Sequence, residues 1–275
     1  MRIEFWKVNG AGNDFVVIDN RDGALSLTGE QVEWLCDRRR GVGADGLILI
    51  EKVAGFDFDM RFYNRDGSPA EMCGNGARCS AHVAAALGEG QRRDDAARVR
   101  FMTGSGPIEA RVQGNRVSMS MMDARAMRRD VPVRLAPRGA AVHFMIVGTR
   151  HAVVPLADVS TLTPEEIVEY GRTLRNDPAF APEGTNVNFC SIATDGRVHL
   201  RTYEKGVEAE TFACGTGSIA SAVLYAHEGR LASPVRVVQR SGDELAVSFE
   251  LGAGGARHVQ LEGPVAVNFR GWTDV

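Results

Sequence analysis

An internal repeat constrains the fold of this 275-residue chain more than any other feature. The segment RFYN at 61–64 is followed by a charged turn, the motif EMCGNG at 71–76 and an Ala-rich stretch. The segment RTYE at 201–204 is followed by a charged turn, the motif FACGTG at 212–217 and an Ala- and Ser-rich stretch. One Cys-Gly-x-Gly copy could arise by chance, but two copies in matched surroundings predict a duplicated domain.

The order of the expected elements supports this division. Each half begins with strand-like segments, continues through a helix and further strands to its Cys-Gly-x-Gly motif, and ends in short strands. We therefore expect an α/β (α+β) chain of two pseudo-symmetric domains, one at residues 1–117 and one at residues 118–264. The C-terminal tail at 265–275 is expected to return to the first domain.

Four helices are expected from local signals. Thr28 is a plausible N-cap for a helix over 28–38, and a capping box begins at Thr163, with Pro164 at N1 and Glu166 at N3. The two motifs should each open a helix, the first near Gly74 and the second over 217–227.

Composition excludes several classes of function. The formal net charge of −3 gives no general attraction to nucleic acid or to an anionic membrane. No apolar run reaches the length of a signal segment or a membrane span. Five cysteines form an odd, sparse set, unlike the disulfide framework of a secreted protein, so the cytoplasm is the expected compartment. Only Lys7, Lys52 and Lys205 could serve as the Schiff-base lysine that a pyridoxal enzyme needs.

The chemistry of each motif follows from its place at a helix start. The first N–H groups of a helix lack internal partners, and together with the helix dipole they form an anion site. Glycine allows close backbone approach, so a substrate carboxylate could lie over the amides after Cys73 or Cys214. The same environment lowers the pKa of a cysteine thiol and favours the nucleophilic thiolate.

Two such motifs related by a pseudo-two-fold axis would place a sulfur on either side of one carbon. A thiolate could then remove a proton from one face while a thiol delivers a proton to the other, which inverts the stereocentre. The alternative role for Cys73 and Cys214 is that of small buried hydrophobes, which we assign instead to Cys36, Cys79 and Cys190. A metal site is disfavoured, because Cys73 and Cys79 lack C-x-x-C spacing and no second ligand cluster accompanies them.

At these residues the sequence closely resembles diaminopimelate epimerase, and the match extends over most of the chain. The motifs that carry the resemblance are NGAGNDF at 9–15, GVGADG at 41–46, EMCGNGAR at 71–78, EGTNVNF at 183–189 and ETFACGTG at 210–217. The resemblance implies two similar domains, each a mixed, mainly antiparallel sheet wrapped on a central helix. It implies interconversion of LL- and meso-2,6-diaminoheptanedioate, in lysine and cell-wall precursor synthesis, without pyridoxal phosphate or metal. It also suggests a homodimer.

The resemblance also assigns roles to residues. It makes Cys73 and Cys214 the acid/base pair, and it makes His151 and Glu204 assistants of proton transfer. The positions that match substrate-contacting residues or the backbone cradle around the substrate are Asn13, Asn64, Gly74, Asn75, Asn186, Glu204, Lys205, Gly215 and Thr216. Which thiol serves which stereoisomer stays open.

Two departures from the family pattern concern substrate recognition. Many members have Gly-Asn-Pro-His where this chain has GTRH at 148–151, so one asparagine contact would be missing. Lys205 stands where an arginine usually binds the distal carboxylate with two hydrogen bonds, and a lysine supplies only a point charge.

Three alternative functions follow. A family racemase acting on another amino acid is suggested by Thr149, Arg150 and Lys205. A thiol-based redox or ligand-binding module would carry out no catalysis. Residues 41–46 also fit the G-x-G-x-x-G pattern of dinucleotide sites, but they precede an expected strand instead of opening a helix, which argues against NAD.

Overall fold

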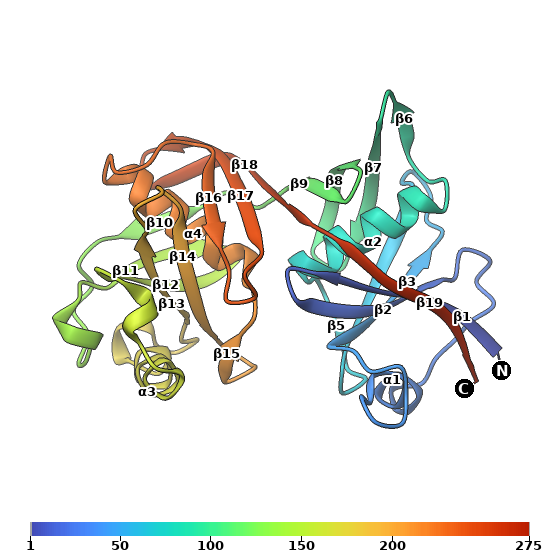
Figure 1. Cartoon of the computed structure of the whole chain (residues 1–275), viewed down its shortest axis with the longest axis horizontal. Helices are drawn as coiled ribbons and strands as arrows, with labels where there is room; N and C mark the ends of the chain where they lie inside the picture. The colour runs from blue at the N-terminus through green and yellow to red at the C-terminus, as the bar shows by residue number, and fades with distance from the viewer. Residues whose placement is uncertain (1, 275) are drawn as a thin grey trace. The chain divides into compact units, whose positions relative to one another are not determined.

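The computed structural model describes residues 2–274 and divides into two compact units. The first unit comprises the residues up to 119 together with those from 263 onward, and the second comprises residues 120–262. Figure 1 shows that each unit is a sheet curved around one helix, α2 in the first unit and α4 in the second.

The sheet of the first unit is mixed and mainly antiparallel. The pairs β1–β19, β1–β2, β3–β4, β7–β8 and β8–β9 are antiparallel, whereas β2–β3 and β4–β7 are parallel. The short strands β5 and β6 pair antiparallel with β4 and β7, respectively. The strands are β1 (Arg2–Gly10), β2 (Asn13–Asp19), β3 (Gly46–Glu51), β4 (Phe58–Asn64), β5 (Pro69–Ala70), β6 (Gln91–Arg93), β7 (Ala96–Thr103), β8 (Gly106–Gln113), β9 (Arg116–Ser120) and β19 (Ala266–Asp274).

The second unit repeats this order. The pairs β10–β11, β11–β12, β13–β14, β14–β15, β16–β17 and β17–β18 are antiparallel, whereas β12–β13 and β14–β16 are parallel. The strands are β10 (Arg125–Arg128), β11 (His143–Val147), β12 (Thr149–Pro155), β13 (Asn186–Ile192), β14 (Val198–Glu204), β15 (Ala209–Thr211), β16 (Val235–Val238), β17 (Glu244–Gly252) and β18 (Gly255–Pro264).

The pairing types match strand by strand between the units. β1, β2, β3, β4 and β7 correspond to β11, β12, β13, β14 and β16, with the two parallel pairs at the same places in the order. The expected fold class, two pseudo-symmetric domains built on mixed, mainly antiparallel sheets, is therefore confirmed.

The central helices are α2 (Gly74–Ala86) and α4 (Gly215–His227), and most of their residues are buried. Alanine and serine dominate both helices because small side chains let strands approach from several sides. The second motif opens its helix at Gly215, two residues before the predicted start. A difference of two residues is usual for a helix end that is assigned from sequence.

Two outer helices connect parallel strands. α1 (Gly29–Cys36) and α3 (Pro164–Arg175) each begin with a complete capping box, at Thr28 and Thr163, as the sequence predicts for Thr163. Gly171 lets α3 pack closely on β14, because a Cβ atom there would lie 2.4 Å from the ring of Tyr203. Three short 3-10 helices complete the second unit: η1 (Pro137–Gly139), η2 (Val159–Thr161) and η3 (Pro178–Phe180).

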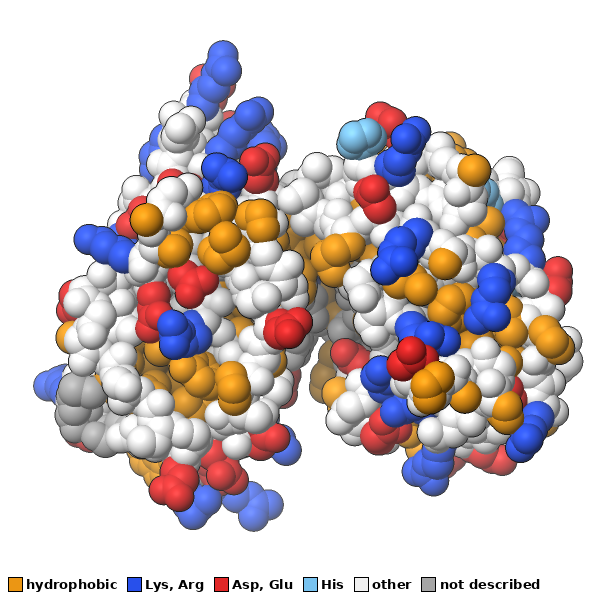
Figure 2. All heavy atoms as spheres, turned by 180° about the vertical axis from the view of Figure 1, so that it is seen from behind, with side chains coloured by type: hydrophobic (Ala, Val, Ile, Leu, Met, Phe, Trp, Pro, Cys, Tyr) orange, Lys and Arg blue, Asp and Glu red, His pale blue; other side chains and the backbone are white. Residues whose placement is uncertain are grey.

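Charged side chains of both signs are interspersed over the face shown in Figure 2. Within residues 2–274, no helix has both the length and the apolar character needed to span a bilayer. Cys36, Cys79 and Cys190 are fully buried thiols, as expected for small hydrophobic residues.

Candidate active site

Cys73 is the N-cap residue of α2, with an extended backbone at φ −134°. Its side chain is half-buried and makes no capping hydrogen bond to the helix. Instead the thiol donates to the Asn13 side chain, with 3.7 Å between Sγ and Oδ1. The first half-site thus joins the start of the central helix to the β1–β2 hairpin.

The hairpin places Asn13 at the beginning of β2. Its two-residue loop, Ala11 and Gly12, has φ values of 57° and 82°. Positive φ at both loop positions is the type I′ geometry, which matches the twist of the flanking strands. The tight turn holds Asn13 opposite Gly10, and Gly10 packs on α2, where a Cβ atom would meet the Cys79 Sγ at 3.2 Å.

A chain of hydrogen bonds passes through Asn13. Its Nδ2 donates to Asp45 Oδ2 at 2.7 Å, and its Oδ1 accepts from Asn75 Nδ2 at 3.3 Å. Asn75 Oδ1 in turn accepts from Arg78 Nη2 at 2.7 Å. Arg78 is fully buried, and Asn75 is buried directly after Gly74 at the helix start.

Arg38, Asp14 and Lys7 form an ion cluster that holds Asp45 in place. Arg38 Nη2 lies 2.6 Å from Asp14 Oδ1 and 2.9 Å from Asp45 Oδ1, and Lys7 Nζ lies 2.5 Å from Asp14 Oδ2. Burial disfavours the charge of Asp14, but hydrogen bonds and attraction from Arg38 and Lys7 outweigh it and hold the pKa of Asp14 at about 2. Asp14 therefore stays charged at neutral pH.

Asn64 lies apart from this network. It ends β4 with an exposed side chain, and its Nδ2 donates to Ser68 Oγ at 3.1 Å across the β4–β5 turn. This contact is that of an asparagine stabilising a turn. A substrate contact for Asn64 stays a prediction.

Cys214 occupies the matching N-cap position of α4. Its Sγ accepts a hydrogen bond from the Gly217 N–H at 3.4 Å and lies 3.6 Å from Thr216 Oγ1. The backbone is held from both sides, because the Cys214 N–H donates to Gln239 Oε1 at 3.0 Å and the Cys214 carbonyl accepts from Ser218 Oγ at 2.8 Å. Gln239 also donates to Ser218 Oγ, which closes the network.

A histidine and an asparagine lie beside this helix start. His151 and Asn188 are both fully buried, with 3.1 Å between His151 Nδ1 and Asn188 Nδ2. Asn188 Nδ2 also donates to the Ala152 carbonyl, so the amide nitrogen faces the imidazole and Nδ1 must accept. Burial lowers the pKa of His151 to about 3, so the ring is neutral, with its proton on Nε2. Within residues 2–274 that Nε2 has no hydrogen-bond partner.

The lack of a side chain at Gly217 lets the Asn188 side chain approach the start of α4. A Cβ atom at Gly217 would lie 2.1 Å from Asn188 Oδ1 and 3.2 Å from Cys214 Sγ. The same oxygen accepts from Thr202 Oγ1 at 3.1 Å. This glycine therefore admits a protein side chain, whereas the sequence interpretation attributed the glycines of the motif to close approach of a ligand.

The predicted recognition residues of the second unit form a neighbouring group. Asn186 pairs with His151 in the β12–β13 register, and its Oδ1 accepts from the Lys205 N–H at 2.8 Å. Lys205 Nζ donates to the Glu183 carbonyl at 3.1 Å, while Arg150 Nη1 lies 2.9 Å from Glu183 Oε2. Beside Lys205 lies Glu204, and burial raises the pKa of its carboxyl group.

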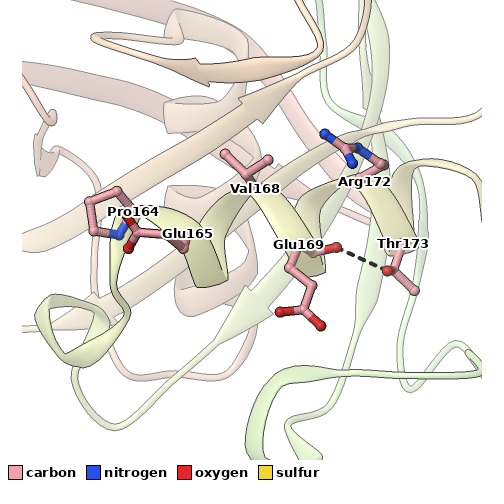
Figure 3. A pocket seen from close by; sticks show the side chains of 6 residues that line it. All are labelled: Pro164, Glu165, Val168, Glu169, Arg172 and Thr173. Atoms are coloured by element: carbon pink, nitrogen blue, oxygen red, sulfur yellow. Dashed lines mark hydrogen bonds between the residues drawn. The ribbon is translucent and has the colours of Figure 1, made fainter.

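A shallow hollow on the outer helix α3 is unrelated to these residues. Figure 3 shows its lining side chains along one face of α3, where Thr173 Oγ1 donates to the Glu169 carbonyl at 2.9 Å. The lining residues are Pro164, Glu165, Val168, Glu169, Arg172 and Thr173. None of them belongs to the predicted site.

The structure thus assembles most predicted residues into three local groups. Cys73, Asn13 and Asn75 share one hydrogen-bond network next to Gly74. Cys214 and Thr216 lie together next to Gly215. His151, Asn186 and Lys205 form the third group, and Glu204 precedes Lys205 on β14.

Sequence reasoning missed several supporting residues. Asp45, Arg78 and Asn188 belong to motifs that we had recognised, but only their contacts assign them a role. Gln239 carries no motif, and nothing in the sequence marks it.

A family model described as diaminopimelate epimerase matches residues 5–127 and 144–256. Diaminopimelate epimerase of Chlorobaculum tepidum is 40% identical over 268 residues, covering 96% of this chain and 98% of that protein. The enzyme of the same name from Aquifex aeolicus is 39% identical over 271 residues, covering 90% of each chain.

Solved structures show the same fold at much lower identity. A probable proline racemase from Agrobacterium radiobacter aligns with a TM-score of 0.72 and 16% identity, covering 99% of this chain and 92% of that one. A phenazine biosynthesis protein of the PhzF family from Bacillus anthracis aligns over the whole of both chains, with a TM-score of 0.73 and 13% identity. The length and identity of the sequence matches go further than the shared fold: this chain belongs to the diaminopimelate epimerase family of isomerases.

Proposed function

We propose that the protein interconverts LL- and meso-2,6-diaminoheptanedioate with Cys73 and Cys214 as the acid/base pair. The observation that carries this proposal is the equivalent place of the two cysteines, each at the N-cap of the central helix in one copy of the duplicated unit. The names of the relatives support the substrate. The mechanism draws on the chain's own side chains, without pyridoxal phosphate or metal.

The proposed reaction moves two protons. One sulfur, as thiolate, takes the proton from the α-carbon, and the other, as thiol, gives its proton to the opposite face of that carbon. The first sulfur ends as the thiol and the second as the thiolate, so the reverse reaction uses the same groups with exchanged roles. The N–H groups that begin α2 and α4 supply preorganised positive ends for the substrate carboxylate and for the negative charge that develops near it.

His151 has a narrower role than a general acid. Because burial lowers its pKa to about 3, the ring is neutral at pH 7 and cannot act as an imidazolium. Because Nδ1 accepts from Asn188, Nε2–H is the hydrogen-bond donor of the ring. We therefore assign His151 to hydrogen bonding of the substrate. Glu204, whose carboxyl pKa is raised by burial, would hold or relay a proton.

The distal end of the substrate is assigned to the group around Lys205. Its ammonium supplies the positive charge that a second carboxylate requires, and Asn186 holds the Lys205 backbone in place. Arg150 adds a second cation nearby, already paired with Glu183. This local set differs from the family pattern, and it is the observation that favours the second candidate, a racemase of the same family for another acidic amino acid.

Partner and pathway assignments are proposals of the same kind. A role in lysine and cell-wall precursor synthesis, a cytoplasmic location and a homodimer all follow from the family. Support for the dimer comes from β19, an edge strand on which Val267, Phe269 and Trp272 are exposed. Sedimentation of the purified protein would test it.

The decisive experiment follows solvent exchange at the α-carbon. The protein is incubated in deuterium oxide with diaminopimelate and, separately, with a panel of acidic amino acids, and both optical purity and deuterium content are measured. Turnover of diaminopimelate supports the leading proposal, whereas turnover of another amino acid alone supports the second candidate. Absence of exchange on every substrate would support the remaining hypothesis, a non-catalytic thiol module.

Matched cysteine variants complete the test. Cys73→Ala and Cys214→Ala should each abolish epimerisation, because inversion requires a proton acceptor and a proton donor. Cys36→Ala and Cys190→Ala remove thiols that are buried outside the motifs, and they should retain turnover in the folded protein.

A further inference from the structure

Asn13 stands in a hydrogen-bond chain that has an ion at each end. Arg78 donates to Asn75 Oδ1, Asn75 donates to Asn13 Oδ1, and Asn13 donates to Asp45 Oδ2, over distances of 2.7, 3.3 and 2.7 Å. The guanidinium is fully buried and the carboxylate is braced by Arg38 and by the Asp14 N–H. Both ends of the chain are therefore fixed.

The two ions leave each amide a single orientation. A carboxylate can only accept hydrogen bonds, so Asn13 must turn its Nδ2 toward Asp45. A guanidinium can only donate, so Asn75 must turn its Oδ1 toward Arg78 and its Nδ2 toward Asn13. These assignments follow from the charges of Asp45 and Arg78.

The orientation of Asn13 determines which of its atoms faces Cys73. With its nitrogen turned to Asp45, Asn13 presents Oδ1 to the sulfur at 3.7 Å. A carbonyl oxygen accepts a hydrogen bond from a thiol but repels a thiolate. The partner motif shows the opposite polarity, because Cys214 Sγ accepts from the Gly217 N–H, a contact that suits a thiolate.

We infer that Asp45 and Arg78 are positioning residues that lock Asn13 with its oxygen toward Cys73 and so hold Cys73 as the protonated thiol in the substrate-free protein. Under the proposed function, on which this inference rests, Cys73 then enters the reaction as the acid. The ionised groups around the chain are Asp14, Asp45, Lys7, Arg38 and Arg78, and any test must separate amide orientation from their net charge.

Two substitutions at Asp45 make that separation in an Asn75→Ala background, in which Asp45 alone still orients Asn13. Both Asp45→Ala and Asp45→Asn remove the charge. In Asp45→Asn the new amide must turn its oxygen to the fixed Asp14 N–H, and the same oxygen then still accepts from Asn13. Its NH2 group faces Arg38, which is half-exposed and retains its pairing with Asp14. Asp45→Asn therefore keeps the orientation of Asn13, whereas Asp45→Ala releases it.

The measurement is the pH profile of Cys73 alkylation by iodoacetamide, in a background that carries both Asn75→Ala and Cys214→Ala, without substrate. Peptide mass spectrometry identifies the modified thiol, and near-ultraviolet circular dichroism verifies folding. Release of Asn13 allows its NH2 group to donate to sulfur, which favours the thiolate. The midpoint for Asp45→Ala should fall roughly 0.5 to 1 pH unit below that for Asp45→Asn, the shift expected for one hydrogen bond. Asp37→Asn, which neutralises a partly exposed carboxylate in the turn after α1, should leave the profile unchanged.

Equal midpoints for folded Asp45→Ala and Asp45→Asn would overturn the inference, as would a higher midpoint for Asp45→Ala. If Asp45→Ala does not fold, the test moves to the side-chain NH2 resonances of Asn13, assigned by Asn13→Ala. These should show the shift of an NH2 group bound to a carboxylate in the wild type and should change in Asp45→Asn; an unchanged signal would also overturn the inference. Both readouts are independent of turnover, so a failure of the proposed function is seen separately in the deuterium-exchange assay.

Discussion

Gly217→Ala tests the packing of the Cys214 half-site. The added methyl would lie 2.1 Å from Asn188 Oδ1 and 3.1 Å from its Cγ, inside a fully buried group. Something must move, and overpacking of this kind costs about 1–3 kcal/mol. Displacement of Asn188 would also weaken its hydrogen bond from Thr202, which contributes about 1 kcal/mol. Replacing glycine by alanine in a helix returns up to about 1 kcal/mol. The net expectation is a loss of about 1–3 kcal/mol.

The other copy of the repeat supplies the control. Gly76 occupies the same place after Cys73, but the nearest atoms to a Cβ atom there are the ends of flexible side chains, Ile48 Cδ1 and Met60 Cε at 3.2 Å, and Cys73 Cβ at 3.4 Å makes an ordinary contact. Gly76→Ala should therefore cost less than Gly217→Ala, by about 1–2 kcal/mol. Urea unfolding of the wild type and both variants, followed by far-ultraviolet circular dichroism, measures the difference.

A functional readout accompanies the stability readout. Because the same methyl lies 3.2 Å from Cys214 Sγ, Gly217→Ala should also lower kcat, by about 100-fold if the sulfur moves by about 1 Å. Equal stability losses in the two variants, or an unchanged kcat in folded Gly217→Ala, would refute the claim that Asn188 is what requires this glycine.

Further predictions concern charge. Asp14 has a folded pKa of about 2 against an ordinary 3.8, so its stabilisation is present above pH 4 and is lost as the pH falls toward 2. Asp14→Asn should be less stable at pH 7 by about 2 kcal/mol, and urea midpoints should converge with those of the wild type between pH 4 and 2. Lys205→Met should raise the KM for diaminopimelate about 10- to 100-fold through loss of a charge-assisted contact, while Lys205→Arg should keep or lower it; an unchanged KM in Lys205→Met would remove Lys205 from recognition.

Most of the fold could be predicted because its signals are local or repeated. The capping box at Thr163 needs only four adjacent residues, and the structure reproduces it. The duplicated order of strands and helices is visible in the two Cys-Gly-x-Gly motifs, and it recurs in the pairing types of the two sheets. A feature that repeats along the chain can be recognised without knowing its contacts.

The supporting residues of the site could not be predicted, because their roles depend on partners far away in sequence. Gln239 holds Cys214 from 25 residues away, and Asp45 orients Asn13 from 32 residues away. The sequence does not reveal which way an asparagine amide points or which tautomer a buried histidine adopts. Burial makes His151 neutral, and the contacts of Asn188 place its proton on Nε2.

The sequence by itself determined the duplication, the capping box at Thr163 and the matching places of the two motif cysteines, since these follow from residue type and spacing. Only the tertiary structure decided what surrounds each sulfur. Cys73 meets a carbonyl oxygen and Cys214 meets an N–H donor, although the motifs around them are nearly the same. The physical reason is that a hydrogen bond depends on which atoms the folded strands bring within about 3–4 Å, and similar motifs can receive different neighbours.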